Sequence, residues 1–278
     1  MTARISFQGE PGANSHIAAR QAFPELEPLP CASFEDAFAA VSEGQARYAM
    51  IPVENSLAGR VADVHHLIPE SGLFIVGERF APIKHQLLGL PEATLDTLTH
   101  VRSHPQALGQ CRRQLREWGV TAVKTADTAG AAREVAELAD PRVGALASAL
   151  AGEIYGLKIL KADIADAAHN TTRFLVFARE ARNAAPGEGP CMTSFVFRVR
   201  NVPAALYKAL GGFATNGVNM TKLESYIEGG AFHAAMFFCE VEGHPEEGKL
   251  QLALEELRFF SSSLSILGVY PADPFRRA

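Results

Sequence analysis

The sequence lacks the long apolar segments that carry a chain into or across a membrane. No window of about 20 consecutive apolar residues occurs in it. The first ten residues carry a charge at Arg4 and lead into turn residues, without the apolar core and small-residue cleavage site of a signal peptide. These absences exclude a membrane-spanning helix and the usual secretion signal, and we expect no membrane partner.

Cysteine is scarce, and its four copies lie far apart. Cys31, Cys111, Cys191 and Cys239 form none of the paired spacings that zinc sites and redox couples use. We expect all four to be reduced and buried. A chain without a disulfide framework or a secretion signal is typical of the reducing cytoplasm, where we expect this protein to be found.

Positive charge is not concentrated anywhere. The 26 basic and 31 acidic residues give a net charge of −5, and no long basic block occurs, which excludes nucleic acid as a partner. The glycines near residues 9 and 12 have the wrong spacing for a dinucleotide fingerprint. Metal-ligand spacings and nucleophile motifs are missing too, and the adjacent His65 and His66 would point apart on a regular element. The sequence therefore predicts no metal and no cofactor.

What the sequence does contain divides into two parts. With 278 residues, 47% of them hydrophobic, the chain can form more than one domain. Residues 182–190 are rich in helix and strand breakers and are typical of a linker. Before this linker, short apolar runs alternate with helical patterns, which predicts an α/β architecture with largely parallel strands. One helix is well marked by apolar residues from Ala107 to Trp118, behind Pro105 and before Gly119.

After the linker, the pattern predicts a βαββαβ unit. We expect strands at 194–199, 218–226, 233–241 and 264–269, with a Gly229-Gly230 turn between the middle two and helices at 204–214 and around Leu254. This order is that of a ferredoxin-like sandwich, with helices on one face of an antiparallel sheet. Bare sheet edges and an open sheet face favour self-association, so we expect a homodimer or homotetramer.

Four polar segments follow or precede apolar strands before the linker, at residues 9–16, 52–59, 102–106 and 170–174. The first opens a helix, where backbone amides with Asn14 and Ser15 suit an anion, although a turn with a helix cap explains it equally well. The last combines hydroxyls, an amide and a guanidinium, although alone it is more typical of a polar turn. His85 and His104, each taken alone, are more typical of structural histidines. Together the segments predict a site for a small anion.

These segments, in this order and followed by the βαββαβ unit, resemble prephenate dehydratase over nearly the whole chain. The resemblance is to the monofunctional form, without a fused chorismate mutase. It rests on Phe7-Gln8-Gly9-Glu10-Pro11-Gly12-Ala13-Asn14-Ser15-His16, Pro52-Val53-Glu54-Asn55-Ser56, Ser103-His104-Pro105-Gln106 and Asn170-Thr171-Thr172-Arg173-Phe174.

The resemblance implies a two-lobed catalytic domain at residues 1–181, folded like a periplasmic binding protein, with the substrate between the lobes. Lobe 1 would comprise about residues 1–80 and 162–181, and lobe 2 about residues 81–161. The linker at 182–190 would then lead to an ACT regulatory domain at 191–278, the ferredoxin-like unit.

The implied reaction is the decarboxylative dehydration of prephenate to phenylpyruvate, carbon dioxide and water in L-phenylalanine biosynthesis. Aromatisation drives it without a cofactor. Arg173 would grip a carboxylate with its planar fork. Thr172 would donate a hydrogen bond to the leaving oxygen, with the proton relayed from water or Glu54. The predicted catalytic residues are Thr172, Glu54 and Asn55, and the predicted substrate-binding residues are Arg173, Asn14, Ser15, Ser56, Gln106, Asn170 and Phe174.

ACT domains of this family bind L-phenylalanine at a dimer interface and inhibit the enzyme. Here the family's Glu-Ser-Arg-Pro motif keeps its glutamate and serine, but Tyr226 and Ile227 replace the arginine and proline. The predicted effector residues are Ala204, Ala205, Leu206, Glu224 and Ser225. The alternative is that Ala205, Leu206 and Tyr226 only pack an interface.

Two other functions remain open from the sequence. Arogenate dehydratase acts on a substrate that differs by one amino group, and these motifs do not separate the two activities. A non-catalytic sensor of organic acids or amino acids is the second alternative. The Thr172 motif disfavours a sensor, because a sensor needs no donor for a leaving group.

Overall fold

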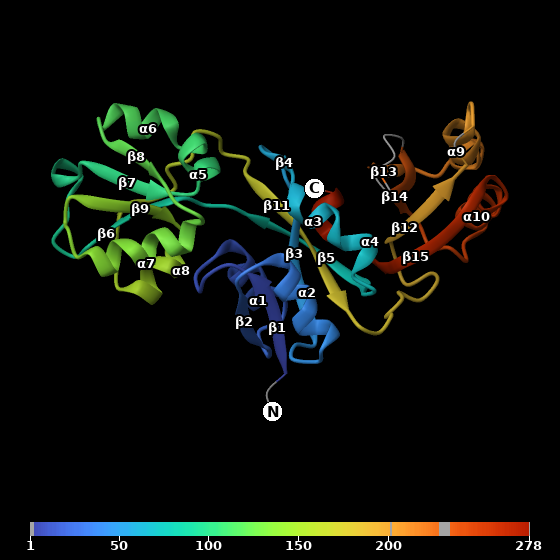
Figure 1. The fold of residues 1–278 in the computed structure, drawn as a ribbon, viewed down its shortest axis with the longest axis horizontal. Coiled ribbons are helices and arrows are strands. Elements are labelled where there is room, and N and C mark those ends of the chain that lie inside the picture. Colours follow the sequence, from blue (N-terminus) through green and yellow to red (C-terminus); the bar gives the residue numbers. More distant parts are fainter. Residues whose placement is uncertain (1–2, 201, 228–233, 278) are drawn as a thin grey trace. The chain divides into compact units, whose positions relative to one another are not determined.

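The computed structural model describes residues 3–200, 202–227 and 234–277, and its strands form three sheets (Figure 1). Contacts divide the chain into two compact units. One contains Met1–Val61 and Arg79–Phe174, and the other contains Ala62–Glu78 and Leu175–Ala278. The division places the segment 62–78 with the C-terminal tail and changes unit between Phe174 and Leu175, before the predicted linker at 182–190.

The first sheet has the strand order β2-β1-β3-β11-β5, with the short β4 paired to β3. β1 runs parallel to β2 and β3, as predicted, and its inner residues Ile5 and Phe7 are fully buried. The strands are β1 (Arg4–Gln8), β2 (Glu27–Cys31), β3 (Tyr48–Asn55), β4 (Gly59–Arg60), β5 (Phe74–Pro82) and β11 (Thr171–Ala178), and the helices between them are α1 (Asn14–Ala22), α2 (Phe34–Ser42), α3 (Ala62–His65) and α4 (Leu67–Glu70).

The second sheet has the order β10-β6-β9-β7-β8. β7 is parallel to β8 and β9, but β6 pairs antiparallel with both β9 and β10, so β6 alone runs against the other four strands and departs from the predicted, largely parallel arrangement. Both faces are buried, because Leu87 and Leu88, neighbours on β6, belong to different hydrophobic clusters. The elements are β6 (Gln86–Gly89), η1 (Leu95–Thr97), β7 (His100–Ser103), α5 (Pro105–Gln110), α6 (Arg112–Glu117), β8 (Thr121–Lys124), α7 (Thr128–Leu138), β9 (Val143–Ala147), α8 (Ala149–Tyr155) and β10 (Lys158–Lys161).

The helix predicted from Ala107 to Trp118 is interrupted at Cys111. Cys111 has φ −118° and ψ 18°, outside the helical range, and separates α5 from α6. The Gln110 carbonyl accepts a hydrogen bond from the Asp166 amide at 2.7 Å instead of continuing the helix. The predicted end at Gly119 is correct, since Gly119 follows α6 with φ +67°.

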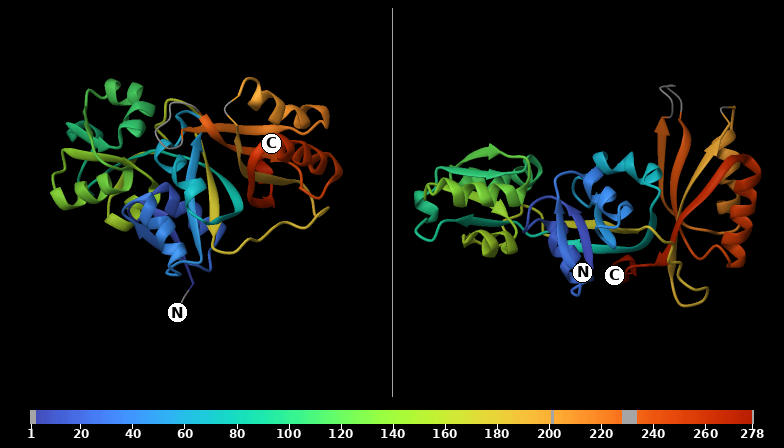
Figure 2. Two further views of the ribbon diagram at one scale, coloured as in Figure 1. Left: turned by 45° about the vertical axis from the view of Figure 1, so that its right-hand side comes forward. Right: turned by 60° about the horizontal axis from the view of Figure 1, so that its bottom comes forward.

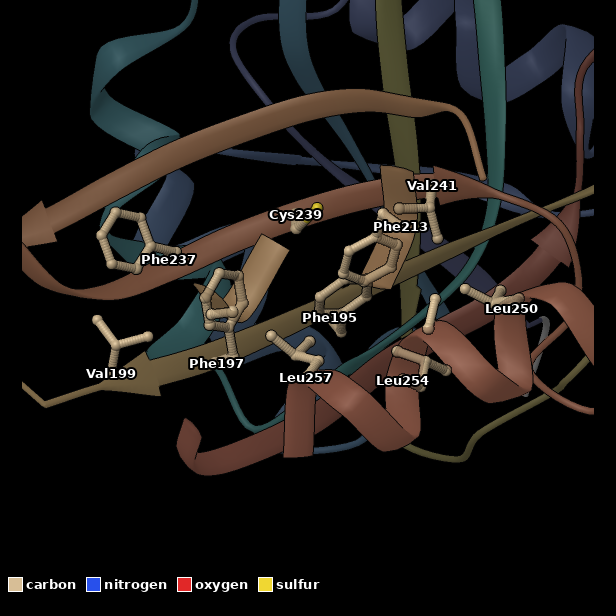
Figure 3. Close-up of a cluster of buried hydrophobic side chains, with 12 residues drawn as sticks. Phe195, Phe197, Val199, Phe213, Phe237, Cys239, Val241, Leu250, Leu254 and Leu257 are labelled. Atoms are coloured by element: carbon tan, nitrogen blue, oxygen red, sulfur yellow. The ribbon is translucent and has the colours of Figure 1, made fainter. Parts of the chain in front are cut away.

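The tail contains the predicted βαββαβ order, and its antiparallel sheet has the order β13-β14-β12-β15. Helices α9 and α10 lie on one face (Figure 2), where Phe195, Phe213 and Leu254 meet in a buried cluster (Figure 3). The predicted Gly229-Gly230 turn lies outside the described residues. The elements are β12 (Cys191–Val199), α9 (Ala205–Thr215), β13 (Met220–Ile227), β14 (Ala234–Glu242), α10 (Gly248–Phe260), β15 (Ser261–Pro271) and η2 (Pro274–Arg277).

The other face of the tail sheet is not open, contrary to the sequence prediction. Ser194, Glu240 and Tyr270 on this face are all fully buried, and the Ser194 and Tyr270 hydroxyl oxygens lie 2.8 Å apart. The segment 62–78 contributes to this covering, because a Cβ added to Gly268 would lie 2.0 Å from the carbonyl oxygen of Ile75. This face of the tail sheet is therefore covered by the same chain. The predicted self-association, which rested partly on an open sheet face, loses that support.

All four cysteines are free thiols. Cys111, Cys191 and Cys239 are buried as predicted, whereas Cys31 is only half-buried, because it lies at the end of the outer strand β2. Among the residues that the structure describes, no helix is long and apolar enough to cross a bilayer.

Candidate active site

Two of the four polar segments meet at neighbouring strand ends in the first unit. β3 ends at Asn55, β11 begins at Thr171, and the two strands are neighbours in the first sheet. Ser56 joins them, because its amide donates to the Thr171 carbonyl at 2.9 Å and its hydroxyl donates to the His169 carbonyl at 2.9 Å. The fold thus brings the predicted residues Asn55, Ser56 and Thr172 together from distant parts of the chain.

The side-chain amide of Asn55 has a fixed orientation. Its Oδ1 accepts hydrogen bonds from the backbone amides of Leu57 at 3.1 Å and Ala58 at 3.0 Å. A backbone N–H can only donate, so this end of the amide must be the oxygen. The NH₂ end therefore faces the other way, where it donates to Asn170 Oδ1 at 2.7 Å and to Thr172 Oγ1 at 3.0 Å.

The orientation of Asn55 determines the orientation of the side chains that follow it in the network, Asn170 and Gln110. Asn170 accepts from Asn55 through Oδ1, so its Nδ2 is the donor to Gln110 Oε1 at 2.9 Å. The same Gln110 oxygen lies 2.7 Å from Nε2 of His85. An amide oxygen can only accept, so His85 Nε2 must carry a proton. Two backbone amides thereby set the direction of every hydrogen bond as far as His85.

The direction of the hydrogen bonds leaves one donor available at Thr172 and one at Gln110. Thr172 is buried, and its oxygen already accepts from Asn55, so its own proton is left for another acceptor. A donor of this kind can stabilise negative charge that develops on a leaving oxygen. Gln110 uses only its oxygen in the network, so its NH₂ group is a second available donor.

The network joins elements of the first and second sheets. Asn55 and Thr172 belong to β3 and β11, whereas Gln110 ends α5 and His85 precedes β6. The two connections between the sheets also contact each other, since the Ile83 amide donates to the Asn170 carbonyl at 2.8 Å. Burial lowers the pKa of His85, and the hydrogen bond with Gln110 partly opposes this shift, so the imidazole is neutral at pH 7.

Arg173 and Glu54 form a separate pair. Successive residues of a strand point to opposite faces, so Glu54 and Arg173 point away from the face that carries Asn55 and Thr172. Arg173 Nη1 donates to Glu54 Oε2 at 3.2 Å, and its guanidinium carbon lies 5.9 Å from the Phe80 ring centroid. The side chain of Arg173 is 5% exposed and that of Glu54 is 38% exposed. A carboxylate ligand would therefore share Arg173 with Glu54.

The first polar segment opens α1, as predicted, but no hydrogen bond recorded among the described residues joins Asn14 or Ser15 to the network. The α1 N-cap is Ala13, whose side chain makes no cap hydrogen bond. The Gly12 amide donates to His16 Nδ1 at 2.9 Å, and its carbonyl accepts from Ser148 Oγ at 2.6 Å. This segment is thus hydrogen-bonded to Ser148, the residue before α8, which follows β9 of the second sheet.

Two further predicted residues lie outside the network. Gln106 is exposed on the first turn of α5, where His104 Nδ1 accepts from its amide at 3.3 Å. Phe174 is 1% exposed and belongs to the core, which leaves its side chain almost no surface for a substrate. Sequence reasoning missed Gln110, although it stands four residues after Gln106 on the same helical face, and it interpreted His85 as structural.

The predicted effector residues lie in the second unit, with two different surroundings. Glu224 Oε2 is 3.5 Å from His65 Nε2, and its Oε1 is 3.4 Å from Lys222 Nζ. Tyr226 stacks on His65 with ring centroids 4.6 Å apart. Ser225 is exposed, Ala205 and Leu206 pack partly against the tail core, and Ala204 is the N-cap before α9, with φ +62°. Tyr226 therefore packs within the chain.

The site consists of neutral amides, hydroxyls, one imidazole and one ion pair. In the described ranges, no group of three or more His, Cys, Asp or Glu side chains is placed to hold a metal ion. The network can therefore donate hydrogen bonds of fixed direction to an anionic or leaving oxygen, and Arg173 supplies positive charge nearby in sequence.

Comparisons with known proteins agree on one family. The family model described as prephenate dehydratase matches residues 5–182. A bifunctional N-acyl-homoserine lactone acylase/prephenate dehydratase from Komagataeibacter europaeus is 53% identical, covering 98% of this chain and 97% of its own. An arogenate dehydratase/prephenate dehydratase from Arabidopsis thaliana is 39% identical, covering 98% of this chain and 73% of its own. A solved prephenate dehydratase from Arthrobacter aurescens, in complex with L-Phe, is 28% identical with a TM-score of 0.89, covering 97% and 90%.

Proposed function

The chain belongs to the prephenate dehydratase family, and we propose that it converts prephenate to phenylpyruvate, carbon dioxide and water. The observation that carries this proposal is the one-way hydrogen bond from Asn55 to Thr172. It leaves the Thr172 proton facing outward from the network, as a donor to the departing ring hydroxyl. Substrate would bind between two lobes built on the first and second sheets, next to the network that joins them.

The reaction needs one proton and no oxidant. The bond between the ring and its carboxylate breaks, and its electron pair enters the ring as the hydroxyl leaves with the electron pair of the C–O bond. The departing oxygen takes up one proton to become water. Thr172 stabilises the charge on this oxygen as the C–O bond lengthens, because its hydrogen bond strengthens when the acceptor becomes more negative. Water delivers the proton, since Glu54 is hydrogen-bonded to Arg173.

Two carboxylates of the substrate need positive or donor groups. We assign one to Arg173, whose side chain leaves the face of β11 opposite to Thr172, so the substrate would have to span the strand end at Thr171 to contact both residues; Glu54 orients the guanidinium in the empty enzyme and shares it in the complex. Gln110 offers its NH₂ group to the second anionic group or to the leaving oxygen. Asn14 and Ser15, with the α1 amides, remain proposed contacts for substrate that reaches this helix start.

The test is turnover by the purified protein, with prephenate and arogenate supplied separately. Formation of phenylpyruvate from prephenate supports the proposal, and formation of phenylalanine from arogenate favours the arogenate activity that some relatives carry in their names. Turnover of neither substrate would favour a sensor. The product absorbance and the release of carbon dioxide should rise together, because decarboxylation and dehydration are coupled.

A second activity has one specific observation in its favour. The relative from Komagataeibacter europaeus, named for both an acylase and a dehydratase activity, covers 98% of this chain at 53% identity. We therefore propose measuring the hydrolysis of an N-acyl-homoserine lactone beside the dehydratase assay. Hydrolysis that survives Thr172→Ala would indicate a separate site. No hydrolysis would leave the dehydratase as the single proposed activity.

We further propose that the tail is an ACT domain through which L-phenylalanine regulates this cytoplasmic enzyme, and that the protein is a homodimer or homotetramer. Support comes from the βαββαβ topology and from the solved relative with bound L-Phe. Effector contacts are assigned to Ala204, Ala205, Leu206, Glu224 and Ser225. Isothermal titration tests this directly, because no heat at millimolar L-phenylalanine would remove the regulatory role. Light scattering gives the oligomer size.

A further inference from the structure

We propose that His85 is a positioning residue, which holds the side chain of Gln110 so that its NH₂ group is presented to the reacting molecule. This inference rests on the proposed dehydratase function. It concerns a histidine that the motifs of the sequence left as structural. The role follows from the direction of the hydrogen bonds around Gln110 and from the way the backbone of His85 is held.

The direction of the hydrogen bond between His85 and Gln110 is determined by residues other than these two. The backbone amides of Leu57 and Ala58 force Asn55 to donate to Asn170, and Asn170 must then donate to Gln110 Oε1. His85 Nε2, at 2.7 Å from the same oxygen, is the second donor. A flipped Gln110 would place its NH₂ group against two donors, so the amide is held in one orientation.

The imidazole of His85 is held in place by burial and by hydrogen bonds of its backbone and of the next residue. His85 is 4% exposed, and its backbone carbonyl accepts from the Ile164 amide at 3.0 Å. Its neighbour Gln86 is held by two hydrogen bonds with Asp163, at 2.9 and 3.0 Å. A neutral ring with its proton on Nε2 leaves Nδ1 unprotonated, so one of the two neutral tautomers is selected.

Both the backbone and the side chain of Gln110 are held by hydrogen bonds. The helix is interrupted directly after it, because its carbonyl accepts from the Asp166 amide at 2.7 Å. Both lone pairs of Oε1 are used by His85 and Asn170, so the NH₂ group is the part of the side chain that remains for a ligand. The arrangement gives the site a second donor with a fixed direction, beside the hydroxyl of Thr172.

The sharpest variant is Gln110→Glu, because a carboxylate keeps both acceptor contacts and replaces the NH₂ group with an oxygen that cannot donate and that carries negative charge. We expect it to fold with an unchanged melting temperature and to lose about 10²-fold to 10³-fold in kcat for prephenate. His85→Leu should lose about tenfold in kcat, the effect of about one hydrogen bond, whereas His85→Gln, which can donate from a similar place, should recover most of it. Full turnover in Gln110→Glu would overturn the proposal.

A double-mutant cycle separates positioning from a purely structural role. If His85 acts through Gln110, His85→Leu should lower kcat in the wild-type background and have no further effect in the Gln110→Glu background. Equal losses in both backgrounds would contradict the role. The ¹⁵N chemical shifts of His85 in the unmodified protein give a readout that needs no substrate. A proton on Nε2 is expected, and a proton on Nδ1 would overturn the proposal even if the enzyme turns over prephenate. If neither prephenate nor arogenate reacts while Nε2 is protonated, the proposed function fails instead.

Discussion

Asn55 and Thr172 lie 117 positions apart in the sequence, and Nδ2 of Asn55 donates to Oγ1 of Thr172 at 3.0 Å. This bond has a single direction, because the backbone amides of Leu57 and Ala58 hold the oxygen end of Asn55. Thr172 is thus an acceptor toward the protein and a donor toward a ligand. A threonine hydroxyl without such a partner would rotate to suit its surroundings.

Asn55→Asp tests this direction. The aspartate keeps an oxygen for Leu57 and Ala58 but cannot donate to Thr172, which would then turn its proton toward the carboxylate. We predict a loss of about 10²-fold or more in kcat, as for removal of one catalytic donor, measured by phenylpyruvate formation. Asn216→Asp is a matched control in the tail, where Asn216 Nδ2 donates to the Gly212 carbonyl at 2.8 Å. Equal turnover in both variants would refute the role of the hydrogen-bond direction.

Gly12→Ala tests the contact between the first polar segment and α8. Gly12 has φ +94°, and an added Cβ would lie 2.6 Å from the Cα atom of Ala151. Gly59 also has a positive φ, +79°, but nothing lies within 4 Å of the added atom. Gly59→Ala should lower the free energy of unfolding by about 1–2 kcal/mol through backbone strain alone. Gly12→Ala should lower it by about 1–3 kcal/mol more through overpacking, measured by urea unfolding. Equal losses would show that the Ala151 contact relaxes freely.

Arg276→Ala tests the buried ion pair of the second unit. Glu78 is fully buried in its side chain and receives Arg276 Nε at 2.6 Å and Nη2 at 2.9 Å. Removal of the arginine takes two charge-assisted hydrogen bonds from a buried carboxylate, so we predict a loss of about 3–5 kcal/mol in the free energy of unfolding. Arg142→Ala removes a bidentate ion pair with Asp140 at the surface and should leave the free energy of unfolding unchanged. Comparable losses in the two variants would contradict this reading of burial.

The buried thiol of Cys111 should make the free energy of unfolding depend on pH in the alkaline range. Burial raises the pKa of Cys111 to about 12, with the nearby Asp166 charge adding to the shift. The folded state therefore favours the neutral thiol, and this contribution is complete below the unfolded pKa of about 8.5 and lost as pH rises toward 12. We predict that the free energy of unfolding of Cys111→Ala falls less steeply above pH 9 than that of the wild type. Parallel curves would disprove the contribution, although Cys239, whose pKa burial also raises, keeps part of the slope in both proteins.

The sequence predicted the fold well where local patterns decide it. The βαββαβ order of the tail followed from strand and helix periods and is present. Long-range contacts decided the rest. Cys111 interrupts a predicted helix because the Gln110 carbonyl binds the Asp166 amide, and no local pattern contains that partner. The tail sheet lacks its predicted open face because residues from segment 62–78 pack against it.

The same distinction applies to the site. Asn55, Asn170 and Thr172 stand in recognisable segments, and the fold brings them into hydrogen-bond contact, while Ser56 of the same segment as Asn55 bonds Thr171. Gln110 stands outside every segment used for the prediction, and its hydrogen bonds with Asn170 and His85 identify it. The opposite faces of Thr172 and Arg173 follow from strand alternation, which becomes decisive only once Thr171–Ala178 is known to be a strand.

The most direct test is the rate of phenylpyruvate formation from prephenate by the wild type, Thr172→Ser and Thr172→Ala, each at the same concentration of folded protein. We predict turnover by the wild type, most of that rate in Thr172→Ser, and a loss of about 10²-fold to 10³-fold in Thr172→Ala with substrate binding retained. A wild type inactive on both prephenate and arogenate would contradict the dehydratase function. An unimpaired Thr172→Ala would contradict the role of the threonine.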